Sequence, residues 1–145
     1  MIVLDQSKRL LLLIISVVAV ACTPLIADYS LESYRYATEL KAETLAMMAK
    51  ATEPYESHED EVERLRVRLS SAREFAAGMP RNRLSAAQWD ILLNPQGNLA
   101  GGFFERWKRE RTLGATFVDE ARRQTSGAFD DIICLEANKG KDTDC

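Results

Sequence analysis

Apolar residues recur at intervals of three and four along most of the chain after Pro24, which is the spacing of one face of an α-helix. Ala, Leu, Glu, Arg and Met dominate these stretches, and no alternating β-branched run is long enough to form a strand. The pattern predicts an all-α protein, folded as a small helical bundle of about three long and two short helices.

Breaks in the pattern predict where the helices begin and end. The expected helices span roughly 28–52, 57–78, 85–93, 102–111 and 115–138. Ser85 and Gln88 have the spacing of a capping box at the start of the third helix. Gly127 interrupts the last helix at a cost of about 1 kcal/mol, which indicates close approach of another backbone or a slight bend. We expect the long helices to run antiparallel to their neighbours.

Three helical faces are expected to point towards the core. They are Leu31, Tyr34, Ala37, Leu40, Leu45 and Met48 in the first helix, Val62, Leu65, Leu69, Ala72 and Ala76 in the second, and Phe117, Ala121, Gln124, Ala128, Ile132 and Leu135 in the last.

The N-terminus has a different pattern, in which Lys8 and Arg9 precede an apolar run from Leu10 to Ala21. The run ends in Ala-Val-Ala followed by Cys22, and this segment resembles the lipobox signal of bacterial lipoproteins. The resemblance implies a signal peptide over 1–21, a lipid on Cys22 and a linker over 22–27. The helical pattern then predicts a helical domain over 28–138 and a tail over 139–145. The resemblance also implies a membrane-anchored protein of the cell envelope. Because Thr23 rather than Asp follows the cysteine, the outer membrane facing the periplasm is expected in a diderm organism.

Two other interpretations of the N-terminus stay open. The uncharged stretch from Leu10 to Ala27 approaches the ~20 residues of a bilayer-spanning helix, although Pro24 disfavours that interpretation. A cleaved signal that releases a soluble protein would leave Cys22 without a role. Alkyl chains on Cys22 would hold the domain at a membrane, since each buried CH₂ contributes about 0.8 kcal/mol.

The net charge and the cysteine content argue against some classes of function for this chain, nucleic-acid binding and metal binding among them. Removal of residues 1–21 takes Asp5, Lys8 and Arg9 with it and changes the net charge from −3 to −4. A mildly acidic domain without a basic stripe is not expected to bind nucleic acid. Cys134 and Cys145 are predicted to form a disulfide, with two free thiols as the alternative. No metal site is expected, because these cysteines have no nearby histidine.

An aromatic cluster between residues 89 and 107 is the densest unusual feature of the chain. Its Trp-x-x-Leu, Asn-Pro and Gly-Gly-Phe-Phe-x-Arg-Trp elements resemble short bacterial lipoproteins of unknown role, a resemblance that implies no activity. Two interpretations are open: a ligand or partner patch, or the inner faces of two short helices that close the bundle. The residues concerned are Trp89, Asn94, Asn98, Phe103, Phe104, Arg106 and Trp107.

No catalytic set is recognisable in the sequence. His58 lacks a second histidine at position 62, so the zinc-protease spacing fails and a solvated residue in a helix's first turn is expected. Carboxylate pairs such as Glu105 with Glu110 or Asp119 with Glu120 could serve acid–base chemistry, but charged residues on amphipathic helices usually form the solvent-exposed face. We therefore expect a non-catalytic envelope protein, without a cofactor, that binds another protein. The alternatives are an immunity or exclusion lipoprotein against a toxin or phage, and a protein that acts on peptidoglycan or binds a small ligand.

Overall fold

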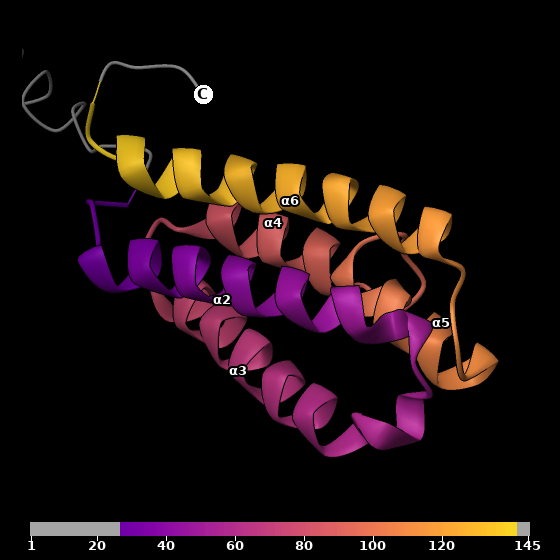
Figure 1. The fold of residues 1–145 in the computed structure, drawn as a ribbon. Helices are drawn as coiled ribbons and strands as arrows, with labels where there is room; N and C mark the ends of the chain where they lie inside the picture. Colours follow the sequence, from indigo (N-terminus) through magenta and orange to yellow (C-terminus); the bar gives the residue numbers. More distant parts are fainter. Residues whose placement is uncertain (1–26, 142–145) are drawn as a thin grey trace, which may run out of the picture.

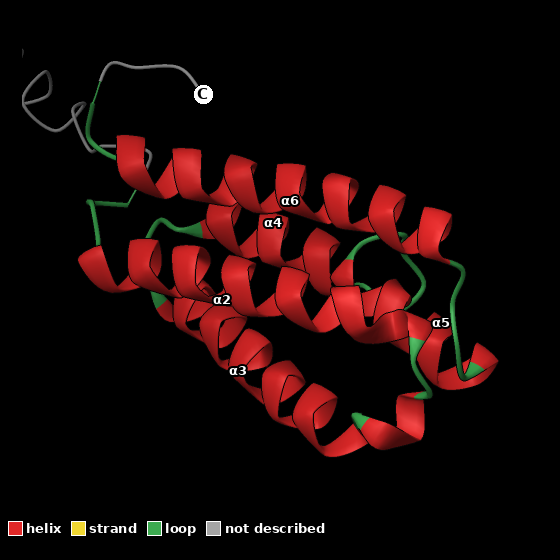
Figure 2. Cartoon of the chain, in the orientation of Figure 1, coloured by secondary structure: helices red, strands yellow, loops and turns green. Residues whose placement is uncertain are grey.

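The computed structural model describes residues 27–141, and in this range the chain is an all-α bundle with no strand (Figures 1 and 2). The predicted fold class is therefore confirmed. Cys22 and Cys145, on which the lipid and disulfide predictions depend, lie outside the described residues. The helices are α2 (Leu31–Ala49), α3 (Glu59–Gly78), α4 (Arg83–Leu93), α5 (Ala100–Glu110) and α6 (Ala115–Asn138), with the 3-10 turns η1 (Lys50–Thr52) and η2 (Tyr55–Ser57) between α2 and α3.

Four of these helices enclose the core in an up-down-up-down arrangement (Figure 1). Helix α2 packs against α3 and α6, and α4 packs against the same two helices from the other side. The expected antiparallel packing is confirmed. Helix α5 follows α4 and packs against α4, α2 and η2 at the end of the bundle where α3 diverges from α2. No helix within residues 27–141 is both long enough and apolar enough to cross a bilayer.

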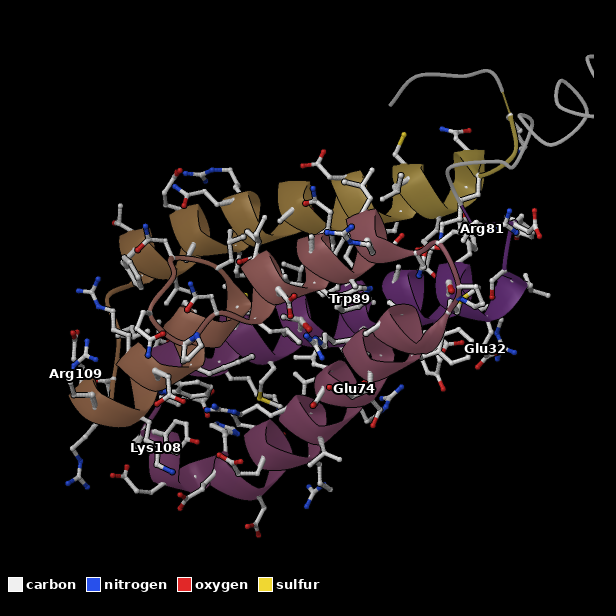
Figure 3. All side chains as sticks on the ribbon, turned by 180° about the vertical axis from the view of Figure 1, so that it is seen from behind. Glu32, Glu74, Arg81, Trp89, Lys108 and Arg109 are labelled. Atoms are coloured by element: carbon white, nitrogen blue, oxygen red, sulfur yellow. The ribbon has the colours of Figure 1, made fainter. Side chains whose placement is uncertain are left out.

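The two ends of the bundle are named here after a residue or helix that lies at each of them. The Ala27 end comprises residues 27–32, 78–84 and 138–141. These segments meet because the Ala27 amide donates to the Arg81 carbonyl at 3.2 Å and Lys139 Nζ donates to Asn82 Oδ1 at 2.6 Å. The opposite, α5 end carries Lys108 and Arg109, whereas Glu32 and Arg81 mark the Ala27 end (Figure 3).

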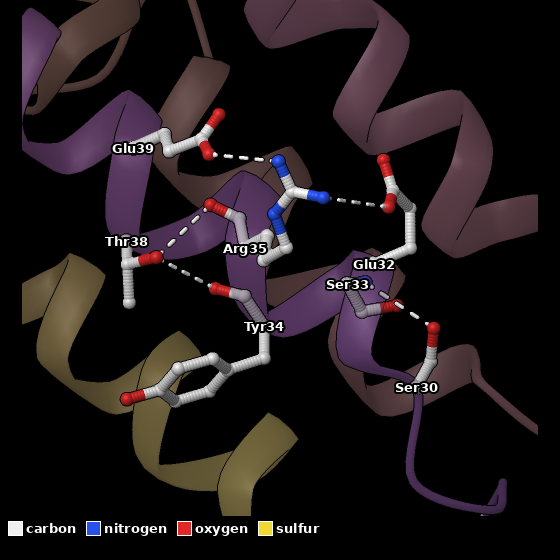
Figure 4. A network of polar contacts seen from close by, with 7 residues as sticks. All are labelled: Ser30, Glu32, Ser33, Tyr34, Arg35, Thr38 and Glu39. Atoms are coloured by element: carbon white, nitrogen blue, oxygen red, sulfur yellow. Dashed lines mark hydrogen bonds and ion pairs between the residues drawn. The ribbon is translucent and has the colours of Figure 1, made fainter.

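The starts of two helices show how local chemistry sets helix boundaries. Ser30 is the N-cap of α2, and its hydroxyl accepts a hydrogen bond from the Ser33 amide at 3.2 Å (Figure 4). The capping box predicted at Ser85 is wrong, because α4 already begins at Arg83 and Ser85 is buried within its first turn. Asn82 precedes the helix, and its side-chain amide donates to the Ala76 carbonyl at 2.8 Å. The α3–α4 turn is thereby held in place, and the helix starts directly after it.

The predicted inward faces are confirmed in α3 and partly wrong in α2. All five expected α3 residues are buried. In α2, Leu31 is 61% exposed, while Ser33 and Thr44 are buried in addition to Ala37 and Leu40. Small polar side chains suit the inward face there because α2 packs against both α3 and α6, and Ser33 Oγ reaches Met79 Sδ at 3.4 Å. Tyr34 and Leu45 are half-buried, and Met47 takes a core position beside Met48.

The buried face of α6 lies one residue beyond the prediction at four of six positions. Ala121 and Ile132 are buried as expected, and the other four buried residues are Val118, Thr125, Phe129 and Glu136. Because Thr125 and Glu136 are polar, a prediction based on hydrophobic spacing does not identify this face as the buried one. The close-approach interpretation of Gly127 is also wrong, since a Cβ there would meet nothing within 4 Å among the described residues.

A buried ion pair explains how Glu136 occupies the core. Its side chain and that of Lys139 are each 1% exposed, and Lys139 Nζ lies 2.5 Å from Glu136 Oε2. The same ammonium donates to Asn82 Oδ1. Because a buried charge needs a partner and hydrogen bonds, this cluster joins the end of α6 to the α3–α4 turn. Within residues 27–141, Glu136 Oε1 has no hydrogen-bond partner.

Aromatic packing holds the α5 end together. Trp107 is fully buried, donates from Nε1 to the Glu53 carbonyl at 3.0 Å and meets Tyr55 edge-to-face at 5.4 Å between ring centroids. The solvated position predicted for His58 is wrong, because its side chain is only 12% exposed and its ring lies 5.7 Å from the Trp107 ring. Its Nε2 lies 2.7 Å from Glu53 Oε2. Burial, followed by the charge of Glu63, raises the pKa of Tyr55 to about 12.

Candidate functional site

The four large aromatic residues of the predicted patch belong to the core. Trp89, Phe103, Phe104 and Trp107 are each at most 2% exposed, so the interpretation as inner faces of short helices is confirmed for them. Trp89 on α4 meets Phe129 on α6 edge-to-face, with ring centroids 5.9 Å apart. The remaining patch residues, Asn94, Asn98 and Arg106, are at least partly exposed.

A recess next to this core brings part of the predicted patch to the surface. It lies between the loop after α4, helix α5 and the first half of α6, and its volume is about 270 Å³. We call it the α5–α6 recess. Its lining residues are Gly97, Asn98, Gly102, Phe103, Arg106, Phe117, Glu120, Ala121 and Gln124.

Aromatic rings form one wall of the α5–α6 recess. The rings of Phe103 and Phe117 are nearly parallel, with an interplanar angle of 3° and centroids 6.0 Å apart. The Arg106 guanidinium lies over the Phe117 ring at 4.1 Å, where a cation is attracted to the ring face. Arg106 Nε also donates to Glu110 Oε1 at 3.0 Å. The wall therefore consists of two parallel aromatic rings, and the Arg106 cation covers the outer one, Phe117.

The α6 rim of the recess is polar beyond Phe117. Gln124 Nε2 donates to Glu120 Oε1 at 2.9 Å, and Arg123 pairs with the other carboxylate oxygen. These hydrogen bonds, the one from Gln124 first, lower the pKa of Glu120 and keep its carboxylate ionised near neutral pH. The recess thus has a cation on the α5 side, an anion on the α6 side and the Asn98 amide on the loop.

The paired glycines Gly101 and Gly102 let two segments of the chain meet at the recess. A Cβ on Gly101 would lie 2.2 Å from the Leu93 carbonyl oxygen, and one on Gly102 would lie 1.8 Å from that of Gly97. Both glycines therefore let α5 start directly against the loop that follows α4. The close backbone approach that these two glycines permit is a contact within the chain itself.

The carboxylate pairs considered for acid–base chemistry are held by cations. Glu105 bonds Arg66 at 2.6 Å, and Asp119 lies 3.9 Å from Arg122. In residues 27–141, no group of three or more His, Cys, Asp or Glu side chains is placed to hold a metal ion. Asn94 serves its own turn, since its Oδ1 accepts from the Gln96 amide at 3.0 Å.

Sequence reasoning missed the α6 side of the recess. Phe117 and Gln124 were expected to face the core, and Glu120 was considered only as one member of a carboxylate pair. These residues share one face of α6, because they are separated by three and four positions. The short connection between α5 and α6 is the signal that places this face beside α5.

Comparisons with known proteins add no family to this description. No protein-family model matches the sequence, and searches among curated proteins and among solved structures find no match.

Proposed function

We propose that this protein is a lipid-anchored, non-catalytic component of the cell envelope that binds another protein through the α5–α6 recess. The lipid is carried by Cys22, and the disulfide between Cys134 and Cys145 holds the C-terminal tail. Support for the anchor comes from the lipobox-like sequence alone. Support for the binding site comes from the fold.

The observation that carries the proposal is the place of the recess in the bundle. Its α6 residues are centred on Ala121, and the helix continues to Asn138 at the Ala27 end. At 1.5 Å per residue, these two positions are about 25 Å apart. A chain tethered just before Ala27 therefore presents the recess on the side away from its tether, where a partner has access.

The dimensions of the recess favour a partner side chain over a free small molecule. Its volume of about 270 Å³ lies just below the range of ~300–1,000 Å³ that is typical of small-molecule pockets. An aromatic or aliphatic side chain fits between the wall and the rim, while Arg106 and Glu120 can pair with polar groups around it. A central apolar anchor with a polar surround is the usual arrangement of a protein interface.

The anchor is tested by mass spectrometry of the intact protein from its native membrane. Loss of residues 1–21 together with added acyl mass on Cys22 supports the proposal, and the same spectrum shows whether Cys134 and Cys145 are joined. A Cys22→Ser variant is expected to leave the membrane fraction. Normal processing and unchanged fractionation of that variant would refute the lipid anchor.

The recess is tested by capture of partners from crosslinked envelopes. Asn98→Arg places a long side chain at the recess and is expected to abolish recovery of the partner. Gln96→Arg is the matched control, because it makes the same charge change in the same loop outside the recess lining. Equal recovery with both variants, at unchanged melting temperature, would exclude the recess as the binding site.

The same capture experiment also tests the two alternative functions, an immunity or exclusion protein and a protein that acts on peptidoglycan or binds a small ligand. Recovery of a toxin or phage component identifies an immunity or exclusion protein. Retention of peptidoglycan fragments by the native chain, but not by Asn98→Arg, identifies a cell-wall ligand. The carboxylates near the recess give no specific reason to favour hydrolysis.

A further inference from the structure

Exposed apolar side chains gather at the Ala27 end. Six large hydrophobic residues are exposed within residues 27–141, and three of them, Tyr29, Leu31 and Leu84, lie in the segments of this end. Their exposed fractions are 50%, 61% and 54%. Neither core packing nor the α5–α6 recess accounts for them.

The Ala27 end is only a few residues away in sequence from Cys22, the proposed site of the lipid. Ala27 is 3% exposed and is bound to the α3–α4 turn through its amide. Five peptide units separate Cys22 from Ala27, and at 3.3–3.6 Å per residue they reach at most about 18 Å. An acyl chain on Cys22 therefore keeps the Ala27 end next to the bilayer, whatever path the linker takes.

A groove beside Leu84 combines cationic and apolar side chains, a combination that suits contact with lipid headgroups. It has a volume of about 580 Å³ and lies between the start of α4 and the end of α6. Arg81 and Arg83 contribute cations to it, and Leu84 and Leu135 contribute apolar surface. Long cationic side chains beside apolar ones suit a membrane surface, where the charges reach the phosphates and the apolar parts are buried.

The net charge of the Ala27 end is too small to be its main attraction to a membrane surface. The exposed cations Arg81, Arg83 and Lys141 stand against exposed Asp28 and Glu32. Arg81 also lies 3.8 Å from Asp28. The apolar side chains and the tether are thus expected to hold the surface, with little dependence on anionic lipid or salt.

We propose that the Ala27 end rests on the phospholipid surface that holds the anchor, with Tyr29, Leu31 and Leu84 at headgroup depth. This inference rests on the lipid anchor proposed above. It gives the bundle a defined orientation, with the α5–α6 recess facing away from the membrane.

The experiment places a photoreactive diazirine amino acid at position 84 of the full chain in native membranes. Position 91 is the matched control: Ile91 is 56% exposed on the same helix and lies about 10 Å further from the Ala27 end. Position 31 is a second reporter, and position 67 on α3 is its control. After irradiation, phospholipid adducts are counted by mass spectrometry, and membrane flotation is recorded on the same sample.

Phospholipid adducts at positions 84 and 31, with none at 91 and 67, are the expected result. Three results would overturn the orientation but leave the anchor intact, provided that the protein floats with the membrane. They are no lipid adduct at position 84, equal adducts at 84 and 91, and a crosslink from 84 to a protein or to a second copy of the chain. Protein that does not float overturns the anchor and the orientation together.

Discussion

Replacing Lys139 by methionine removes the cation that is bound to buried Glu136. Both side chains are 1% exposed, so water does not screen the lost charge. Removing one partner of a buried ion pair costs about 3–5 kcal/mol, which is a large share of the ~5–15 kcal/mol that stabilises a domain. Asn82 Oδ1 loses its donor as well. We therefore expect Lys139→Met to lower the free energy of unfolding by about 3–5 kcal/mol.

The assay is urea denaturation at neutral pH of the chain from Thr23 onward. Lys141→Met is the control, because Lys141 is exposed two residues further on and its loss should change stability by no more than about 0.5 kcal/mol. The double variant Glu136→Leu with Lys139→Met removes both charges and should cost far less than the two single losses added together. Equal stability of Lys139→Met and Lys141→Met would refute the buried pair.

Three further outcomes are expected from the same denaturation measurements. Gly102→Ala should destabilise by several kcal/mol or prevent folding, because its Cβ would meet backbone at 1.8 Å, whereas Gly127→Ala should stabilise by about 0.5–1 kcal/mol. Similar effects of the two substitutions would contradict the packing of α5 on the preceding loop. Thr44→Val should stabilise by about 1 kcal/mol, since it removes a buried hydroxyl that has no hydrogen-bond partner among the described residues; a loss of stability would show that the hydroxyl is bonded. The pKa of Tyr55 is raised from 10.0 to about 12, so stability should be intact below about pH 10 and fall by about 2–3 kcal/mol as the pH rises to about 12. Tyr55→Phe should lack this part of the alkaline loss, and an unchanged pH profile in that variant would rule out the assignment.

The sequence predicts this fold well wherever apolar spacing alone sets the buried face. Helix α3 is the clearest case, because its five inward residues are all apolar and all buried. Helix α6 is predicted in extent, but its buried face is displaced, since a hydrophobic pattern treats Thr125 and Glu136 as outward-facing. The burial is possible because Lys139 binds both Glu136 and Asn82. Asn82 lies 57 residues before Lys139, so the sequence does not show that it completes this cluster.

The candidate site is predicted only in part, for a related reason. The aromatic cluster between positions 89 and 107 adjoins the recess, yet Trp89, Phe104 and Trp107 are buried in the core and only Phe103 of these rings lines the recess. Phe117 and Glu120 come from a different helix, and although the short connection brings α6 back beside α5, apolar spacing does not indicate which face of α6 meets it. Gly101 and Gly102 are informative only once the loop that they contact is known.

Residues 27 and 141 both belong to the Ala27 end (Figure 1). A reporter protein fused close after residue 141 would therefore start at the Ala27 end, which the proposed lipid anchor on Cys22 would place at the membrane. The connection between α5 and α6, where Thr112 and Gly114 are exposed, lies at the opposite end, so an epitope there would stay clear of the membrane surface.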